Sequence, residues 1–232
     1  MMQHSLDQLA VFIVQLFVIV DPLAAVPIFL AITSHHNRGE RRAIARRGCL
    51  IGYFVIVLFI IAGPALLDYF GIGRSAVLIS GGLLLFVIAL ELLYGNPTGT
   101  QTSSSEERLA EKKEDVSVTP LAIPLLAGPG AIVTCLVFAS QAPDLLSILL
   151  FAAGAFVVFF CAYLLLHWAD ELARVLGVLG MKVAVRIIGL VLAFIAVQYV
   201  INGITELWPA VRMHAPAAKT SALVHRYPSL HL

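Results

Sequence analysis

Residues 9–32 read LAVFIVQLFVIVDPLAAVPIFLAI, an apolar run interrupted by one acid and two prolines. The run is long enough for the roughly 20 residues that an α-helix needs to cross a bilayer. Asp21 lies near its middle, where inserting an acid costs about 2.5 to 3.5 kcal/mol, so such a side chain normally faces a cavity, a partner or a proton path. Pro22 and Pro27 lack the amide hydrogen that a helix uses, so they predict a break beside the acid.

Similar apolar blocks recur along the chain, at 49–67, 76–94, 118–140, 145–167 and 183–207. Hydrophobic residues make up 60% of the chain and charged residues 12%, whereas about 25% of a soluble domain is charged. The blocks predict an all-α membrane protein with six transmembrane helices in a lipid bilayer. The formal net charge of +1, with no basic stripe, argues against nucleic acid as a partner.

Lysines and arginines are unequally divided between alternate loops. Eleven lie within 38–47, 108–113 and 174–186, and four lie on the other side, namely Arg74, Arg212, Lys219 and Arg226. Because cytoplasmic loops retain the excess of positive charge, both termini are expected outside the cytoplasm. The expected organisation is a first three-helix repeat (1–95), a polar cytoplasmic linker (96–117), a second three-helix repeat (118–208) and a flexible periplasmic tail (209–232).

An internal repeat appears when the sequence is shifted by 107 residues. Residues 21–26 (DPLAAV) then align with 128–133 (GPGAIV), and residues 82–91 (GLLLFVIALE) align with 189–198 (GLVLAFIAVQ). Because each half holds three helices, the second half must enter the membrane from the opposite face. The chain is therefore expected to consist of two inverted repeats, an architecture typical of secondary transporters.

The second half also contains a helix-breaking stretch. Residues 120–130 read PLAIPLLAGPG, with three prolines and two glycines, so the fourth helix is expected to be broken like the first. Matched breaks in two repeats point to a binding site for a solute or an ion. The candidate site residues near the breaks are Asp21, Pro22, Gly128, Pro129, Gly130 and Thr134.

Three further polar residues lie in apolar blocks. Glu91 either lines the pathway or extends to the cytoplasmic interface, since it lies close to the end of its block. Its repeat partner Gln198 and the nearby Asn202 either line the pathway or form hydrogen bonds between helices.

No motif for phosphate binding, metalloprotease chemistry or a hydrolase nucleophile is found, so an enzyme is not expected. The three cysteines lie in apolar blocks without the spacing of a metal site. We therefore expect no catalytic residues, no metal and no cofactor, apart from H⁺ or Na⁺ as a coupling ion.

Residues 21–29 (DPLAAVPIF) and 119–132 (TPLAIPLLAGPGAI) resemble the MarC family of bacterial and archaeal integral membrane proteins. The resemblance extends from Leu6 to about Pro209. It implies a multi-pass protein of the bacterial inner membrane with periplasmic termini, similar to members described as small neutral amino acid transporters.

The hypothesis from the sequence is a secondary transporter of a small polar solute, in which Asp21 changes protonation or binds Na⁺. A membrane scaffold or stress-response partner and a passive channel are the alternatives. The sequence leaves the substrate, the direction of transport and the formation of a homo-oligomer open.

Overall fold

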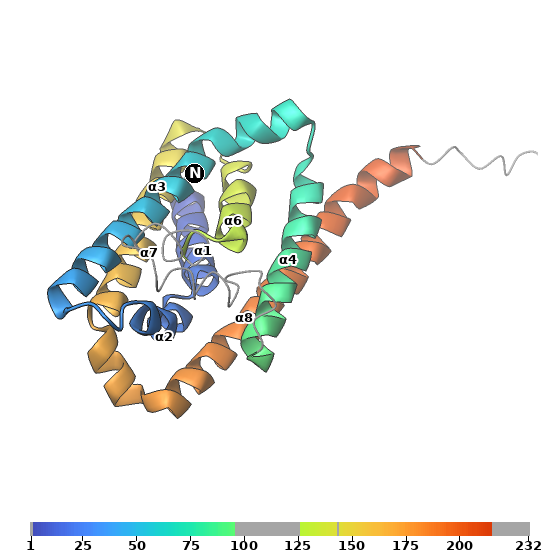
Figure 1. The fold of residues 1–232 in the computed structure, drawn as a ribbon. Helices are drawn as coiled ribbons and strands as arrows, with labels where there is room; N and C mark the ends of the chain where they lie inside the picture. Colours follow the sequence, from blue (N-terminus) through green and yellow to red (C-terminus); the bar gives the residue numbers. More distant parts are fainter. Residues whose placement is uncertain (1, 96–125, 143, 215–232) are drawn as a thin grey trace, which may run out of the picture.

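The computed structural model describes residues 2–95, 126–142 and 144–214, and its elements in this part are α-helices (Figure 1). In chain order they are α1 (Met2–Val20), α2 (Pro22–Ile32), α3 (Arg38–Phe70), α4 (Arg74–Tyr94), α6 (Pro129–Ala139), α7 (Leu145–His167) and α8 (Ala169–His214). The all-α prediction is confirmed for these described residues.

Five helical stretches of the described residues are long and apolar enough to cross a membrane. They are Asp7–Ile32, Arg38–Phe70, Arg74–Tyr94, Leu145–His167 and Ala169–Leu207. The apolar helix α6 is shorter than a membrane span. Five to six apolar helices of this kind fit a multi-pass membrane protein.

Several predicted boundaries differ from the observed ones. The second block begins at Arg38 instead of 49, because Asn37 and Glu40 form a reciprocal cap that starts α3 in the Arg-rich loop. The sixth block is joined to the preceding charged segment in α8, although Gly177 interrupts the helical conformation there. Helix α8 also continues to His214, beyond the expected start of the tail at 209.

Pro27 does not break the helix as predicted but lies inside α2. It is exposed, and the helix loses only the hydrogen bond that an N–H at this position would have donated to the Leu23 carbonyl oxygen. The predicted linker 96–117, residues 118–125 with the first part of the second break, and the tail beyond His214 lie outside the described residues.

Helix boundaries recur at the offset found in the sequence. Helices α2 (Pro22–Ile32) and α6 (Pro129–Ala139) both begin at a proline and start and end 107 residues apart. The residues that cap α3 and α7 follow the same spacing. Asn37 accepts a hydrogen bond from the Glu40 amide at 3.0 Å, and Asp144 accepts one from the Ser147 amide at 2.9 Å. These helix boundaries therefore recur in the two halves, although the residues before α2 and α6 differ in backbone conformation, with φ 41° at Asp21 and −71° at Gly128.

Packing between helices α4 and α8, which lie side by side in Figure 1, is reciprocal. A Cβ added to Gly82 would lie 2.7 Å from the Ala196 carbonyl oxygen. A Cβ added to Gly189, 107 residues after Gly82, would lie 3.3 Å from the carbonyl oxygen of Ala89, the counterpart of Ala196. Only residues without a side chain permit such close approach of two backbones.

The short helices pack on the opposite half of the chain. Helix α2 contacts α7 and α8, whereas α6 contacts α3 and α4. Phe12 of α1 reinforces the core, since its ring lies 5.2 Å from that of Phe138 and 5.0 Å from that of Phe151. The two halves therefore share one core.

Arg41 of α3 ties the end of α2 to the start of α8. Its Nε donates to the Thr33 carbonyl oxygen at 3.0 Å, and its Nη1 donates to Asp170 Oδ1 at the same distance. A guanidinium can make these bonds together because its donors are held in a planar fork.

Replacement of Arg41 by methionine is expected to lower the free energy of unfolding by about 1 to 2 kcal/mol, because charge-assisted hydrogen bonds are lost while the aliphatic stem is retained. Thermal unfolding in detergent measures the change. Arg42→Met is the control, since Arg42 is exposed. An equal loss in both variants would contradict a specific role for Arg41.

Candidate functional site

Asp21 lies at the junction of α1 and α2 and is 3% exposed. Its backbone has φ 41° and ψ 64°, in the left-handed region that Asp tolerates better than most residues. This conformation ends α1 at Val20 and lets Pro22 occupy the first position of α2, where the absence of an N–H costs nothing. The local sequence thus explains why the chain turns at this residue.

The two carboxylate oxygens of Asp21 have different surroundings. Oδ1 accepts a hydrogen bond from the Ala24 amide at 3.1 Å, which caps α2. Oδ2 is buried and has no hydrogen-bond partner among the described residues. Because burying an unpaired charge is costly, this oxygen is suited to carrying a proton or contacting a cation.

The start of α6 packs beside this junction. A Cβ added to Gly130 would lie 3.2 Å from a side-chain carbon of Ile19, two residues before Asp21, and 2.8 Å from one of Leu85 in α4. The structure therefore brings Gly130 close to the first break. Of the other site residues predicted near the two breaks, Pro22 is buried and Pro129 is exposed. Gly128 is half-buried and caps α6.

Thr134 belongs to a polar cluster that also includes the buried Tyr199 and the half-buried Gln15. The Thr134 hydroxyl donates to the Gly130 carbonyl oxygen at 3.0 Å, and the Tyr199 hydroxyl donates to Gln15 Oε1 at 2.8 Å. The Thr134 side chain lies close to the Tyr199 hydroxyl. This cluster joins α1, α6 and α8.

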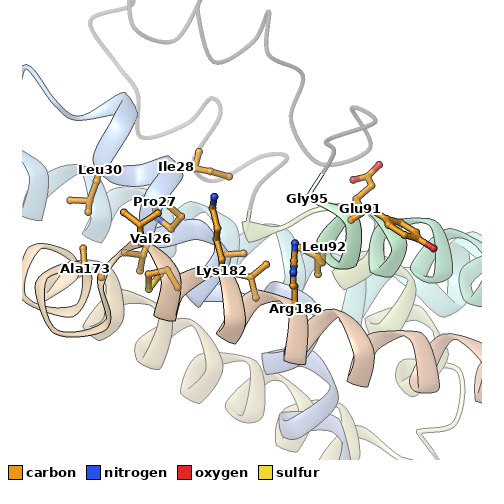
Figure 2. A pocket seen from close by; sticks show the side chains of 16 residues that line it. Val26, Pro27, Ile28, Leu30, Glu91, Leu92, Gly95, Ala173, Lys182 and Arg186 are labelled. Atoms are coloured by element: carbon orange, nitrogen blue, oxygen red, sulfur yellow. The ribbon is translucent and has the colours of Figure 1, made fainter.

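A cavity of about 730 Å³ opens between α2, the end of α4 and the first part of α8 (Figure 2). Its volume lies within the range of roughly 300 to 1,000 Å³ typical of small-molecule sites. Glu91 of α4 lines it, as do Lys182 and Arg186, which project into it from α8 in Figure 2. Most of the remaining wall is apolar, including Pro27 and Ile28.

Gln198 and Asn202 are exposed and pair with each other, Gln198 Nε2 donating to Asn202 Oδ1 at 2.8 Å. Neither residue lines the cavity or has a hydrogen bond to Asp21 among those of the described residues. The structure therefore groups the predicted residues in three places: Asp21 with Gly130 and Thr134, Glu91 in the cavity, and the amide pair on α8.

Sequence reasoning did not include Gln15, Tyr199, Lys182 or Arg186 among the site residues. Gln15 could have been recognised as a candidate, because it is a polar residue within the first apolar block. Lys182 and Arg186 were interpreted as part of a cytoplasmic loop, whereas they lie on α8. Among the described residues, no group of three His, Cys, Asp or Glu side chains could hold a metal ion.

Comparison with known proteins gives a family match over nearly the whole chain. The model described as "MarC family integral membrane protein" matches residues 6–208. A UPF0056 membrane protein of Archaeoglobus fulgidus is 36% identical over 193 residues, which cover 82% of this chain and 89% of that protein. The UPF0056 inner membrane protein YhgN of Escherichia coli is 32% identical over 200 residues, covering 84% and 94%.

UPF0056 membrane protein YvbG of Bacillus subtilis is also 32% identical, over 199 residues that cover 85% of this chain and 94% of that protein. No solved structure matches the chain. The family match over residues 6–208 covers the region that contains Asp21, the cavity and the polar cluster.

Proposed function

The chain belongs to the MarC family of integral membrane proteins, and from that membership we propose that it is a secondary transporter of a small polar solute. Two inverted three-helix repeats, 1–95 and 118–208, alternate access to a site near the middle of the membrane. The first and fourth helices are broken at this site. The protein lies in a bacterial inner membrane with both termini in the periplasm.

One observation carries the proposal: the Asp21 carboxylate has a buried oxygen without a hydrogen-bond partner among the described residues, at the point where one membrane span turns from α1 into α2. An ionisable group at such depth is expensive and typically marks an ion or proton pathway. Irregular backbone is tolerated there only where it is packed in protein or lines a cavity. Asp21 accordingly binds the coupling ion, H⁺ or Na⁺.

The repeats are supported by the recurrence of helix boundaries and contacts 107 residues apart. Helices α2 and α6 correspond at both ends, and Gly82 and Gly189 occupy reciprocal positions between α4 and α8. An inverted pair of this kind provides two related arrangements around one site, which is the basis of alternating access.

In this proposal the cavity, whose lining includes Ala24 but not Asp21, leads from the cytoplasm toward Asp21. It is lined by α2 and α4 of the first half and by α8 of the second, so both halves contribute to it. Glu91 can pair with an ammonium group, and Lys182 and Arg186 can pair with a carboxylate. These charges suit a zwitterion, so the solute is a small neutral amino acid or a related metabolite.

Counterflow tests the proposal. Liposomes containing the purified protein are loaded with unlabelled glycine, alanine or serine, and uptake of the labelled amino acid is followed. A carrier accumulates label transiently and saturates. A passive channel only equilibrates the label, and a scaffold gives the rate of empty liposomes; either result would refute the transporter.

Lys182→Met is expected to raise the half-saturating concentration of the amino acid about tenfold, the equivalent of about 1.4 kcal/mol of lost ion pairing. The measurement is counterflow against solute concentration. Arg174→Met is the matched control, because Arg174 is an exposed cation of the same helix that does not line the cavity. Equal effects of the two substitutions would exclude a solute contact at Lys182.

A further inference from the structure

The walls of the cavity have counterparts in the other half of the chain. Its α2 wall includes Val26, Pro27, Ile28 and Leu30, and the end of α4 contributes Glu91, Leu92, Tyr94 and Gly95. The residues 107 positions later are Val133, Thr134, Cys135 and Val137 of α6, and Gln198, Tyr199, Ile201 and Asn202 of α8. These residues all lie within the described part of the chain.

The counterparts differ from the cavity walls in exposure. Pro27 is exposed and Ile28 is half-buried, whereas Thr134 and Cys135 are completely buried. Tyr199 is 4% exposed and holds α8 against α1 through its hydrogen bond to Gln15. Positions 27 and 28 of α2 are therefore open, whereas the equivalent positions 134 and 135 of α6 are closed.

Resting on the transporter function above, we propose that Thr134, Cys135, Gln198, Tyr199 and Asn202 line a second, outward-facing cavity, which the Tyr199–Gln15 hydrogen bond closes in this structure. Inverted repeats reach the opposite-facing state by exchanging their conformations. In that state α6 and the second part of α8 adopt the open arrangement that α2 and the end of α4 have here. The Tyr199 ring then moves away from Gln15 and Thr134.

The exposed amide pair fits this assignment. Gln198 and Asn202 lie within the membrane-spanning part of α8, where polar groups normally face protein or a hydrated cavity. Their position beside Tyr199 places them at the mouth of the outer cavity. The outer cavity offers neutral hydroxyl and amide groups, whereas the inner cavity offers the charged side chains of Glu91, Lys182 and Arg186. Because charge-assisted hydrogen bonds are the stronger ones, a zwitterion binds more weakly from outside.

Thiol labelling tests the proposal with a cysteine that the chain already has. Cys135 is a free cysteine, and Cys49→Ala and Cys161→Ala leave it as the only one in the sequence. A membrane-impermeant sulfonated maleimide is added to the outer face of spheroplasts. A second probe, Ile28→Cys in a chain also carrying Cys135→Ala, reports the inner cavity in inverted vesicles.

Tyr199→Phe removes the hydrogen bond and retains the ring. It is expected to raise the labelling rate of Cys135 from outside about fivefold and to lower that of Ile28→Cys from inside, since one lost hydrogen bond shifts a two-state population by about that factor. Tyr163→Phe is the matched control, because the Tyr163 hydroxyl lies 3.3 Å from His167 Nδ1 on α7, away from the cluster. It should change neither rate.

Opposite changes at the two probes support the outward-facing cavity. A higher labelling rate at both probes indicates a loosened fold. An unchanged labelling rate at Cys135 indicates that Tyr199 does not close an outer cavity. Either result overturns the assignment. Labelling is measured without solute, so it is independent of transport. Normal counterflow with unchanged labelling refutes only the outer cavity, whereas absent counterflow in the unsubstituted protein refutes the transporter.

Discussion

Asp21→Asn is expected to abolish solute accumulation driven by an ion gradient, with at least a hundredfold loss of the coupled rate. The amide has nearly the shape of the carboxylate, tolerates the left-handed backbone and can accept the Ala24 hydrogen bond that caps α2. It can neither release a proton nor neutralise a cation. The expected variant is therefore a folded protein without coupling, measured as uptake into proteoliposomes under an imposed pH or Na⁺ gradient.

Asp68→Asn provides the matched control, because Asp68 is an exposed acid of α3 outside the junction. The control should retain the unsubstituted rate. Gradient-driven transport by Asp21→Asn at the rate of the unsubstituted protein would remove Asp21 from the mechanism. A pH gradient that drives uptake without Na⁺ identifies the ion as H⁺.

Gly82→Val is expected to lower the free energy of unfolding by about 3 kcal/mol, the upper part of the range for overpacking. Its Cβ would lie 2.7 Å from the Ala196 carbonyl oxygen and 3.0 Å from the Val200 amide nitrogen. These are backbone atoms, so no rotamer change relieves the overlap. The midpoint of unfolding in detergent gives the measurement.

Gly180→Val is the control for helix propensity, because a Cβ at Gly180 would meet only the Leu176 side chain of its own helix. The control should lose less than about 1 kcal/mol. Comparable losses in the two proteins would show that α4 and α8 separate easily, which would contradict their close crossing.

The sequence predicted the features that local chemistry dictates. An acid and a proline in the middle of an apolar block identified the turn at Asp21. The repeat alignment paired Gly82 with Gly189, and the structure places both at close contacts. Pro27 was misjudged, since a proline can remain inside a helix where it is exposed. The starts of α3 and α8 were missed because a search for apolar blocks leaves out the charged residues that extend an apolar helix.

The remainder of the site depends on contacts between distant residues. Gln15 and Tyr199 are 184 residues apart. The sequence around either residue does not predict that the two side chains form a hydrogen bond. Glu91 and Lys182 meet around the cavity only because α4 and α8 pack together. Periodicity finds helices and breaks, but it does not determine which polar side chains face one another.

The crossed packing of the short helices also determines when the chain can fold. Helix α2 contacts α7 and α8, which are synthesised after it and close to the end of the chain. Val26 and Phe29, buried in the completed protein, therefore remain in lipid while the rest of the chain is inserted. The first half must stay loosely assembled in the bilayer during translation, and the compact form arises only when the last helix arrives.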